Sequence, residues 1–198
     1  MNAPAPAPEL SGPAAAQGLV VLAGAQWPQR PQDTVAPVPG FILSSFQPLV
    51  AEVAGRCLRD RPVAEPAPLT GLLLASARGD TVTRAVVAAA LAEGRPVSPL
   101  LFYQSNPNAV AGHVAARWGL AGPVVCTAPL GGSAEAVLAD ALGCAALLIE
   151  DGDAEQVLVV AADQGGGAGE PDHAVAVLVA AAAVPRRLVT SEGRDQRT

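Results

Sequence analysis

The sequence is poor in basic residues, and this shortage excludes one large class of partners. It contains twelve arginines and no lysine against eighteen aspartates and glutamates, which gives a formal charge of −6 and a pI near 4.8. Nucleic-acid binding draws most of its affinity from a basic face that neutralises phosphates. The charge balance therefore predicts that the protein does not bind nucleic acid.

Signals for export and for membrane insertion are also missing. The N-terminus has neither the basic start nor the continuous apolar segment of a signal peptide. The longest apolar tract, residues 174–184, is shorter than the ~20 residues with which a helix crosses a bilayer. We therefore expect a cytoplasmic protein that is not inserted in a membrane.

Cysteine and histidine are scarce and widely spaced. The three cysteines, Cys57, Cys126 and Cys144, form an odd set without paired spacing, so no disulfide framework is predicted. The two histidines, His113 and His173, are isolated, and no His/Cys/Asp spacing is typical of a metal site. We expect no metal and no other cofactor, and we expect free thiols that pack as small hydrophobes.

The length of 198 residues is typical of one domain. Residues 1–17 form an Ala/Pro-rich tail, and residues 186–198 form a polar and charged one. Neither tail has enough apolar side chains to form a core, so both are expected to be disordered. The folded domain is therefore expected to span residues 18–185.

Inside this domain, continuous apolar runs of strand length alternate with segments of helical periodicity. This alternation predicts an α/β fold of the order βαβαβαββ, with a mostly parallel sheet and helices on both faces. The last two strands are expected to form a hairpin at the sheet edge. The expected strands are 18–24, 69–75, 124–127, 157–161 and 174–181, with a short extended piece at 99–105, and the expected helices are 44–60, 80–93, 108–118 and 132–150.

The expected helix 132–150 is apolar around most of its circumference, which predicts a buried central helix. Residues 122–136 lead from an apolar strand into it through Gly-Pro-Val-Val-Cys-Thr-Ala-Pro-Leu-Gly-Gly-Ser-Ala-Glu-Ala. A helix N-terminus of this kind can lower a thiol pKa and bind an oxyanion through backbone amides. Pro129, however, supplies neither a nucleophile nor an amide hydrogen.

Three stretches together resemble the N-terminal half of a β-ketoacyl synthase, over about residues 41–181. They are residues 99–112 (PLLFYQSNPNAVAG), 119–128 (GLAGPVVCTA) and 158–163 (LVVAAD). Truncated, chain-length-factor-like members of this thiolase-like superfamily look most similar. The resemblance implies a thiolase-like half fold in which Pro129 occupies the position of the nucleophilic cysteine. The family's two catalytic histidines lie in its second half, and neither histidine here matches them.

The resemblance therefore implies no catalytic residue in this chain. Cys126 is an alternative nucleophile, but its place inside the strand 124–127 predicts burial, which raises a thiol pKa. The candidate residues of an acyl tunnel or an interface are Phe102, Ser105, Asn108, Cys126, Thr127, Ala128 and Pro129.

By the same resemblance, we expect a non-catalytic accessory subunit of a type II polyketide or fatty-acid-like system. Its partner would be a full-length β-ketoacyl synthase in a heterodimer, or a second copy in a homodimer. An acyl carrier protein would be met only indirectly. Two alternatives stay open: a thioester-dependent acyltransferase acting with a partner subunit, and a small-molecule-binding α/β domain unrelated to acyl chains.

Overall fold

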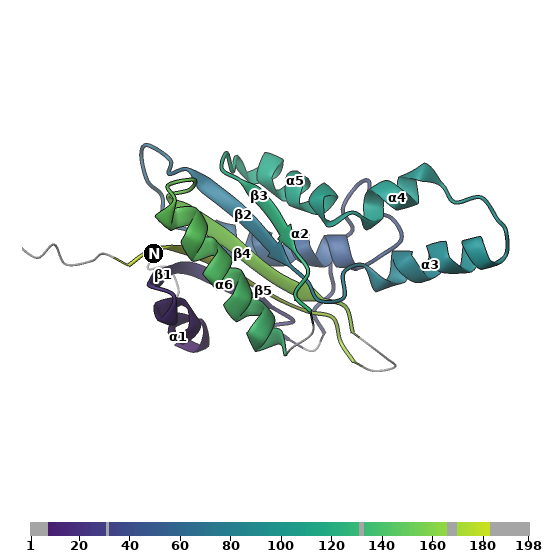
Figure 1. Ribbon diagram of the computed structural model, residues 1–198, viewed down its shortest axis with the longest axis horizontal. Helices are drawn as coiled ribbons and strands as arrows, with labels where there is room; N and C mark the ends of the chain where they lie inside the picture. The colour runs from purple at the N-terminus through teal and green to yellow at the C-terminus, as the bar shows by residue number, and fades with distance from the viewer. Residues whose placement is uncertain (1–7, 31, 131–132, 166–169, 183–198) are drawn as a thin grey trace, which may run out of the picture.

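One five-stranded sheet separates two helical layers (Figure 1). The computed structural model describes residues 8–30, 32–130, 133–165 and 170–182. The sheet has the order β1-β5-β4-β2-β3, in which β4, β2 and β3 are parallel and β5 is antiparallel to both of its neighbours. The strands are β1 (Leu19–Trp27), β2 (Thr70–Ala75), β3 (Val124–Thr127), β4 (Gln156–Asp163) and β5 (His173–Ala181).

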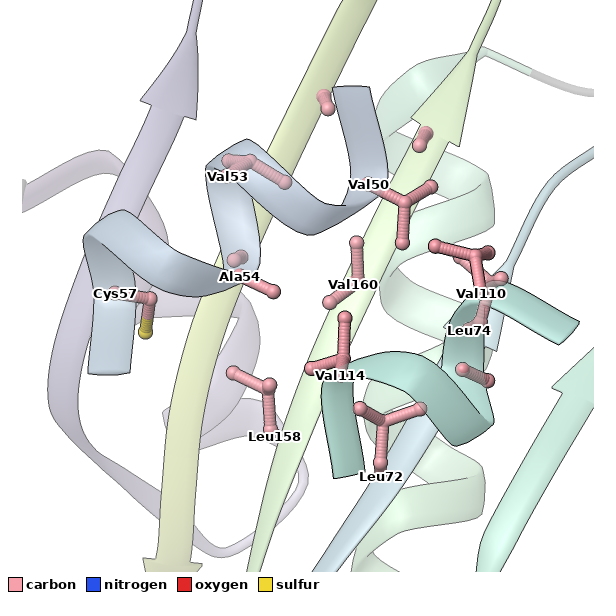
Figure 2. Packing of buried hydrophobic residues seen from close by; sticks show 14 of the residues in the cluster. Val50, Val53, Ala54, Cys57, Leu72, Leu74, Val110, Val114, Leu158 and Val160 are labelled. Carbon is pink, nitrogen blue, oxygen red and sulfur yellow. The ribbon is translucent and has the colours of Figure 1, made fainter. Parts of the chain in front are cut away.

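Helices cover both faces of this sheet, as the continuous apolar strands predict. The elements α2 (Phe46–Arg59) and α5 (Pro107–Trp118) pack on one face, and α1 (Pro8–Ala16) and α6 (Ala134–Glu150) pack on the other. Figure 2 shows the first of these layers, where side chains of α2 and α5 meet Leu72, Leu158 and other alternate residues of the strands. The remaining helices, α3 (Thr81–Ala92) and α4 (Pro99–Ser105), extend away from the sheet (Figure 1).

Local capping explains where several helices begin and end. The backbone N–H of Thr83 donates to the Asp80 carboxylate at 2.9 Å, which fixes the start of α3. The Asn106 side chain accepts from the backbone N–H of Asn108, and Pro107 stands in the first turn of α5. Gly119 ends α5 with a left-handed φ of 66°, a conformation that glycine adopts without strain. The helices predicted at 80–93 and 108–118 are thus confirmed.

Two predictions about local structure are wrong. Residues 99–105 form the helix α4 and not an extended piece, because Ser98 caps it through Leu100 N–H and Pro99 starts its first turn. The tail prediction fails for residues 8–16, which form α1. Ala14 of α1 is fully buried, in the hydrophobic cluster that also contains apolar side chains of α6. Residues 1–7 and the predicted tail 186–198 lie outside the described residues.

Two predictions about the sheet and its central helix also need correction. The β4–β5 hairpin is antiparallel as predicted, but it lies inside the sheet, because β1 pairs along the other side of β5. Only one face of the helix α6 is buried, the face that packs on the sheet. Leu142 on this face is 1% exposed, whereas Leu147 on the other face is 58% exposed. In the described residues, no helix is long and apolar enough to span a bilayer.

Candidate functional site

The candidate site lies where β3 ends and the chain turns toward α6. Leu72 N–H donates to the Pro123 carbonyl at 2.8 Å, and Ser76 N–H donates to the Thr127 carbonyl at 3.1 Å. These bonds hold β3 against β2, so that Thr127 and Ala128 come at the carboxyl edge of the sheet. Pro129 follows them, half-buried, and Ser133 caps α6.

Neither Pro129 nor Ser133 offers an activated nucleophile. Proline carries no amide hydrogen for an oxyanion, as the sequence already indicates. The Ser133 hydroxyl accepts from Ala136 N–H at 3.4 Å and lies 3.4 Å from a Glu135 carboxylate oxygen. It therefore serves as the helix cap that its position predicts.

The cysteine nearest the turn is not activated either. Cys126 is partly buried in β3, and burial raises the pKa of its thiol. Cys57 lies in the core between α2 and the sheet, where burial raises its pKa to about 12. Because the thiolate is the reactive form, both thiols are weaker nucleophiles at neutral pH than an exposed cysteine.

The two histidines occupy separate places. His113 of α5 contacts Phe41 edge to face at 6.1 Å between ring centroids, and its buried Nε2 has no hydrogen-bond partner in the described structure. His173 begins β5 opposite Asp163 and lines a small cavity beside Ala134, in the first turn of α6. Sequence reasoning treated His173 as isolated, because only the strand pairing brings it to this helix.

Asp163 is engaged elsewhere, so it does not form a catalytic pair with His173. Its carboxylate accepts hydrogen bonds from Ser76 Oγ at 2.7 Å, from Arg78 N–H at 2.8 Å and from Ala77 N–H at 3.3 Å. Within the described ranges, no hydrogen bond joins His173 to Asp163 or to Ser133. Asp163 thus anchors the loop of residues 76–79 that follows β2.

Gln164, the residue after β4, connects the end of this strand to the starts of α3 and α2. Its Oε1 accepts from the Thr81 N–H at 2.8 Å and from the Thr81 hydroxyl at 2.9 Å, at the start of α3. Its Nε2 donates to Ser44 Oγ and Ser45 Oγ, just before α2. Sequence reasoning missed this network. The available signal was that polar residues directly follow both β2 and β4, whose carboxyl ends meet at one sheet edge.

Some of the predicted site residues come together in one cavity of about 300 Å³, here named the β2–β3 cavity. Cys126, Thr127 and Ala128 line it from β3, and Leu74 and residues 76–79 line it from the end of β2, with Arg84 of α3 and Pro107 of α5 completing it. Pro129 follows these residues in the chain but is not part of the lining.

The other predicted residues lie apart from this cavity. Asn108 lines a second hollow of about 450 Å³ with Phe41, Tyr103 and His113. The Ser105 hydroxyl donates to the Phe102 carbonyl at 2.9 Å and so closes the end of α4. The Phe102 side chain is 76% exposed. The described residues contain no group of three or more His, Cys, Asp and Glu that could hold a metal ion.

Comparison with known proteins identifies the family. The model of the β-ketoacyl synthase N-terminal domain matches residues 25–184. The chain belongs to this family. The sequence matches no curated protein.

Solved structures with a similar fold include three that contain a ketosynthase with a chain length factor or an acyl-carrier protein. A chain of the ketosynthase ApeO in complex with its chain length factor ApeC, from Xenorhabdus doucetiae, has a TM-score of 0.63 at 16% identity, over 82% of this chain and 79% of that one. The ishigamide ketosynthase/chain length factor has a TM-score of 0.57 at 22% identity, over 79% of this chain and 50% of that one. A type II polyketide synthase acyl-carrier protein in complex with its ketosynthase, bound to the hexaketide, has a TM-score of 0.59 at 14% identity, over 82% and 62%.

These likenesses confirm the thiolase-like ketosynthase fold that the sequence resemblance implies. The chain spans about half the length of the ishigamide protein and most of the length of the matched Xenorhabdus chain. That Pro129 occupies the position of the family's nucleophilic cysteine stays a prediction from the sequence resemblance.

Proposed function

We propose that the protein is a non-catalytic, chain-length-factor-like subunit of a type II polyketide or fatty-acid-like system. The observation that carries this proposal is Pro129 at the turn between β3 and α6. This turn belongs to a ketosynthase fold, yet it lacks a thiol and an amide hydrogen at the required position. The raised pKa of Cys126 supports the same conclusion, because this thiol is a poor substitute.

A full-length β-ketoacyl synthase is the proposed partner. The Xenorhabdus complex pairs a ketosynthase with its chain length factor, and the chain matched there is about as long as this one. A short ketosynthase-like chain can therefore exist inside a ketosynthase assembly. This precedent favours the heterodimer over the homodimer as the first hypothesis to test.

In the part of the chain that the structure describes, β3 pairs on one side only, and its unpaired edge supports an interface at this end of the sheet. The carbonyls of Pro123 and Thr127 bond to β2, so the backbone groups of Val124 and Cys126 between them face the open edge. Val124 is 40% exposed. An unpaired strand edge of this kind can pair with another chain.

The helices α3 and α4 add an exposed apolar surface beyond the sheet. Only Thr83 and Ala90 of α3 are buried, although most of its residues are apolar. Leu91 is 65% exposed on α3, and Phe102 and Tyr103 are 76% and 59% exposed on α4. Exposed aromatic and aliphatic side chains in one region are typical of a protein–protein interface.

Binding to a co-encoded synthase tests the proposal directly. Light scattering and co-purification should detect a complex at micromolar concentration, and Phe102→Asp should weaken it at least tenfold. The matched control is Val63→Asp, because Val63 is 91% exposed in the loop between α2 and β2. A stable monomer that gains no partner when a synthase is added would argue against the proposal. A homodimer that Phe102→Asp disrupts would show that the partner at this surface is a second copy of the chain and not a synthase.

An acyl carrier protein is proposed to dock on the synthase and not on this subunit. Carrier proteins are acidic, and a basic patch on the partner speeds their encounter. This chain carries a net charge of −6. Its direct affinity for a carrier should be weak and sensitive to salt. Micromolar binding that persists at high salt would contradict this part of the proposal.

A further inference from the structure

The β2–β3 cavity lies where open α/β sheets bind ligands. After β2 the chain crosses to the face covered by α5, whereas after β3 it crosses to the face covered by α6. Neighbouring parallel strands whose connections leave to opposite faces form a crevice at their carboxyl ends. The ends of these two strands line the cavity, with Leu74 and Ser76 on one side and Cys126 on the other.

Both charged residues in the described lining of this cavity are arginines, Arg78 and Arg84. The Arg84 guanidinium donates to the Arg78 carbonyl at 3.1 Å and forms no ion pair among the described residues. Arg78 pairs with Glu170 at 3.4 Å, but both side chains are about half exposed, and such surface pairs are weak. Guanidinium donors are therefore available at the cavity.

The two buried carboxylates near the cavity do not use these donors. Asp80 accepts from Thr83 N–H and from Gln47 Nε2. Asp163 accepts from the Ser76 hydroxyl and from backbone amides of the 76–79 loop. Because backbone and neutral side-chain donors satisfy both acids, the arginine side chains keep free N–H groups for another anion.

The rest of the lining is mostly apolar. Leu74, Ala77, Pro107 and Ala128 contribute apolar surface, and Thr127 adds one hydroxyl. The volume of about 300 Å³ is at the lower end of small-ligand sites. We infer that the β2–β3 cavity binds a small organic anion, with one carboxylate or phosphate group on a short apolar chain and with Arg84 as its main anion-binding residue. This inference does not depend on a synthase partner.

Titration of the purified full chain with four probes tests both parts of the ligand. Hexanoate and hexyl phosphate carry the anion and the tail, 1-hexanol carries the tail alone, and inorganic phosphate carries the charge alone. Binding is followed by NMR shifts of the backbone amides of Gly79 and Ala128. A parallel readout is protection of Cys126, relative to Cys144, from alkylation. We expect saturable binding of hexanoate or hexyl phosphate, and the preferred one identifies the head group.

Two variants should weaken this binding without disturbing the fold. Arg84→Gln removes the anion-binding charge from an exposed side chain, and it should raise the dissociation constant about tenfold. Ala128→Asp places a negative charge at the cavity wall, which would repel the anion, so it should also weaken binding. Arg117→Gln is the matched control, because Arg117 is exposed in the last turn of α5 and is not part of the lining. Circular dichroism checks that each variant folds.

Several outcomes overturn the inference. Equal binding of 1-hexanol and hexanoate would show that the cavity does not recognise the anionic group. Equal binding of inorganic phosphate and hexyl phosphate would show that it does not recognise the apolar chain. No saturable binding of any probe at 10 mM, or equal losses for Arg84→Gln and Arg117→Gln, would refute it entirely. None of these results bears on synthase binding, so the inference and the proposed function fail independently.

Discussion

Asp163 should be one of the most important polar residues for stability, because its carboxylate holds the loop that follows β2. The side chain is 6% exposed and accepts three hydrogen bonds, from Ser76 Oγ, Ala77 N–H and Arg78 N–H. Asp163→Ala removes all three acceptor contacts at once. The substitution also removes the hydrogen bonds that hold the loop of residues 76–79, which lines the β2–β3 cavity.

The expected loss follows from where the donors lie. Hydrogen bonds to charged groups contribute about 1.5–3 kcal/mol each, and an unsatisfied buried donor costs about 1–3 kcal/mol. The Ser76 hydroxyl is buried, whereas Ala77 and Arg78 lie near the surface, where water can replace the carboxylate. We therefore expect Asp163→Ala to lower the free energy of unfolding by about 3 kcal/mol. Asp163→Asn keeps the shape and one acceptor oxygen, and it should lose about half as much.

Urea denaturation followed by circular dichroism measures these differences, and the melting temperature of Asp163→Ala should fall by about 6–12 °C. The control is Asp153→Ala, since Asp153 is exposed in the turn after α6. A loss below about 1 kcal/mol for Asp163→Ala, or one equal to that of the control, would refute the reasoning. An Asn variant less stable than the Ala variant would contradict the role of the remaining acceptor oxygen.

Three further predictions concern packing, catalysis and pH. Gly122→Ala should destabilise by about 1–3 kcal/mol in urea denaturation, because an added Cβ would lie 2.7 Å from the backbone of Gly71 and Thr70; a neutral result would contradict the clash. Pro129→Cys should gain no condensation in an acyl and malonyl thioester assay, since groups for proton transfer are not restored; turnover by the variant would overturn the assignment. The stability of the wild type should fall as pH rises from about 9 to about 12, because Cys57 stays protonated when folded and ionises when unfolded; an equal fall in Cys57→Val would exclude this thiol as the cause.

The central strands and most helices could be predicted from the sequence because local chemistry determines them. The strand β2 is apolar from Gly71 to Ala75 and lies in the interior of the sheet, with both faces covered. The strand β3 has the predicted bounds, and α5 begins within one residue of its prediction, where Asn106 and Pro107 give a strong start signal.

The wrong predictions have identifiable causes. With seven residues, α4 is too short for helical periodicity to outweigh its apolar run, although Ser98 and Pro99 are a start signal. The position of the β4–β5 hairpin depended on β1, whose pairing with β5 joins segments about 150 residues apart. No local pattern reports such a distant contact.

The candidate site was predictable only in part for the same reason. Cys126, Thr127 and Ala128 are consecutive, so their shared place at the end of β3 followed from the strand. Arg78 and Arg84 reach the same cavity from the loop after β2 and from α3. Nothing in the sequence connects them to β3 until the parallel pairing of β2 and β3 is known.

The central helix shows why composition alone overestimates burial. Ala136 and Ala139 lie on the outer side of α6, as does Gly143, and Leu147 is the large apolar side chain there at 58% exposure. Hydrophobic stabilisation scales with the area removed from water, and small side chains expose little area. A helix can therefore be apolar around most of its circumference and still expose one face to solvent at a small cost in free energy. The same small residues would let another helix approach closely, so this face permits a covering layer without requiring one.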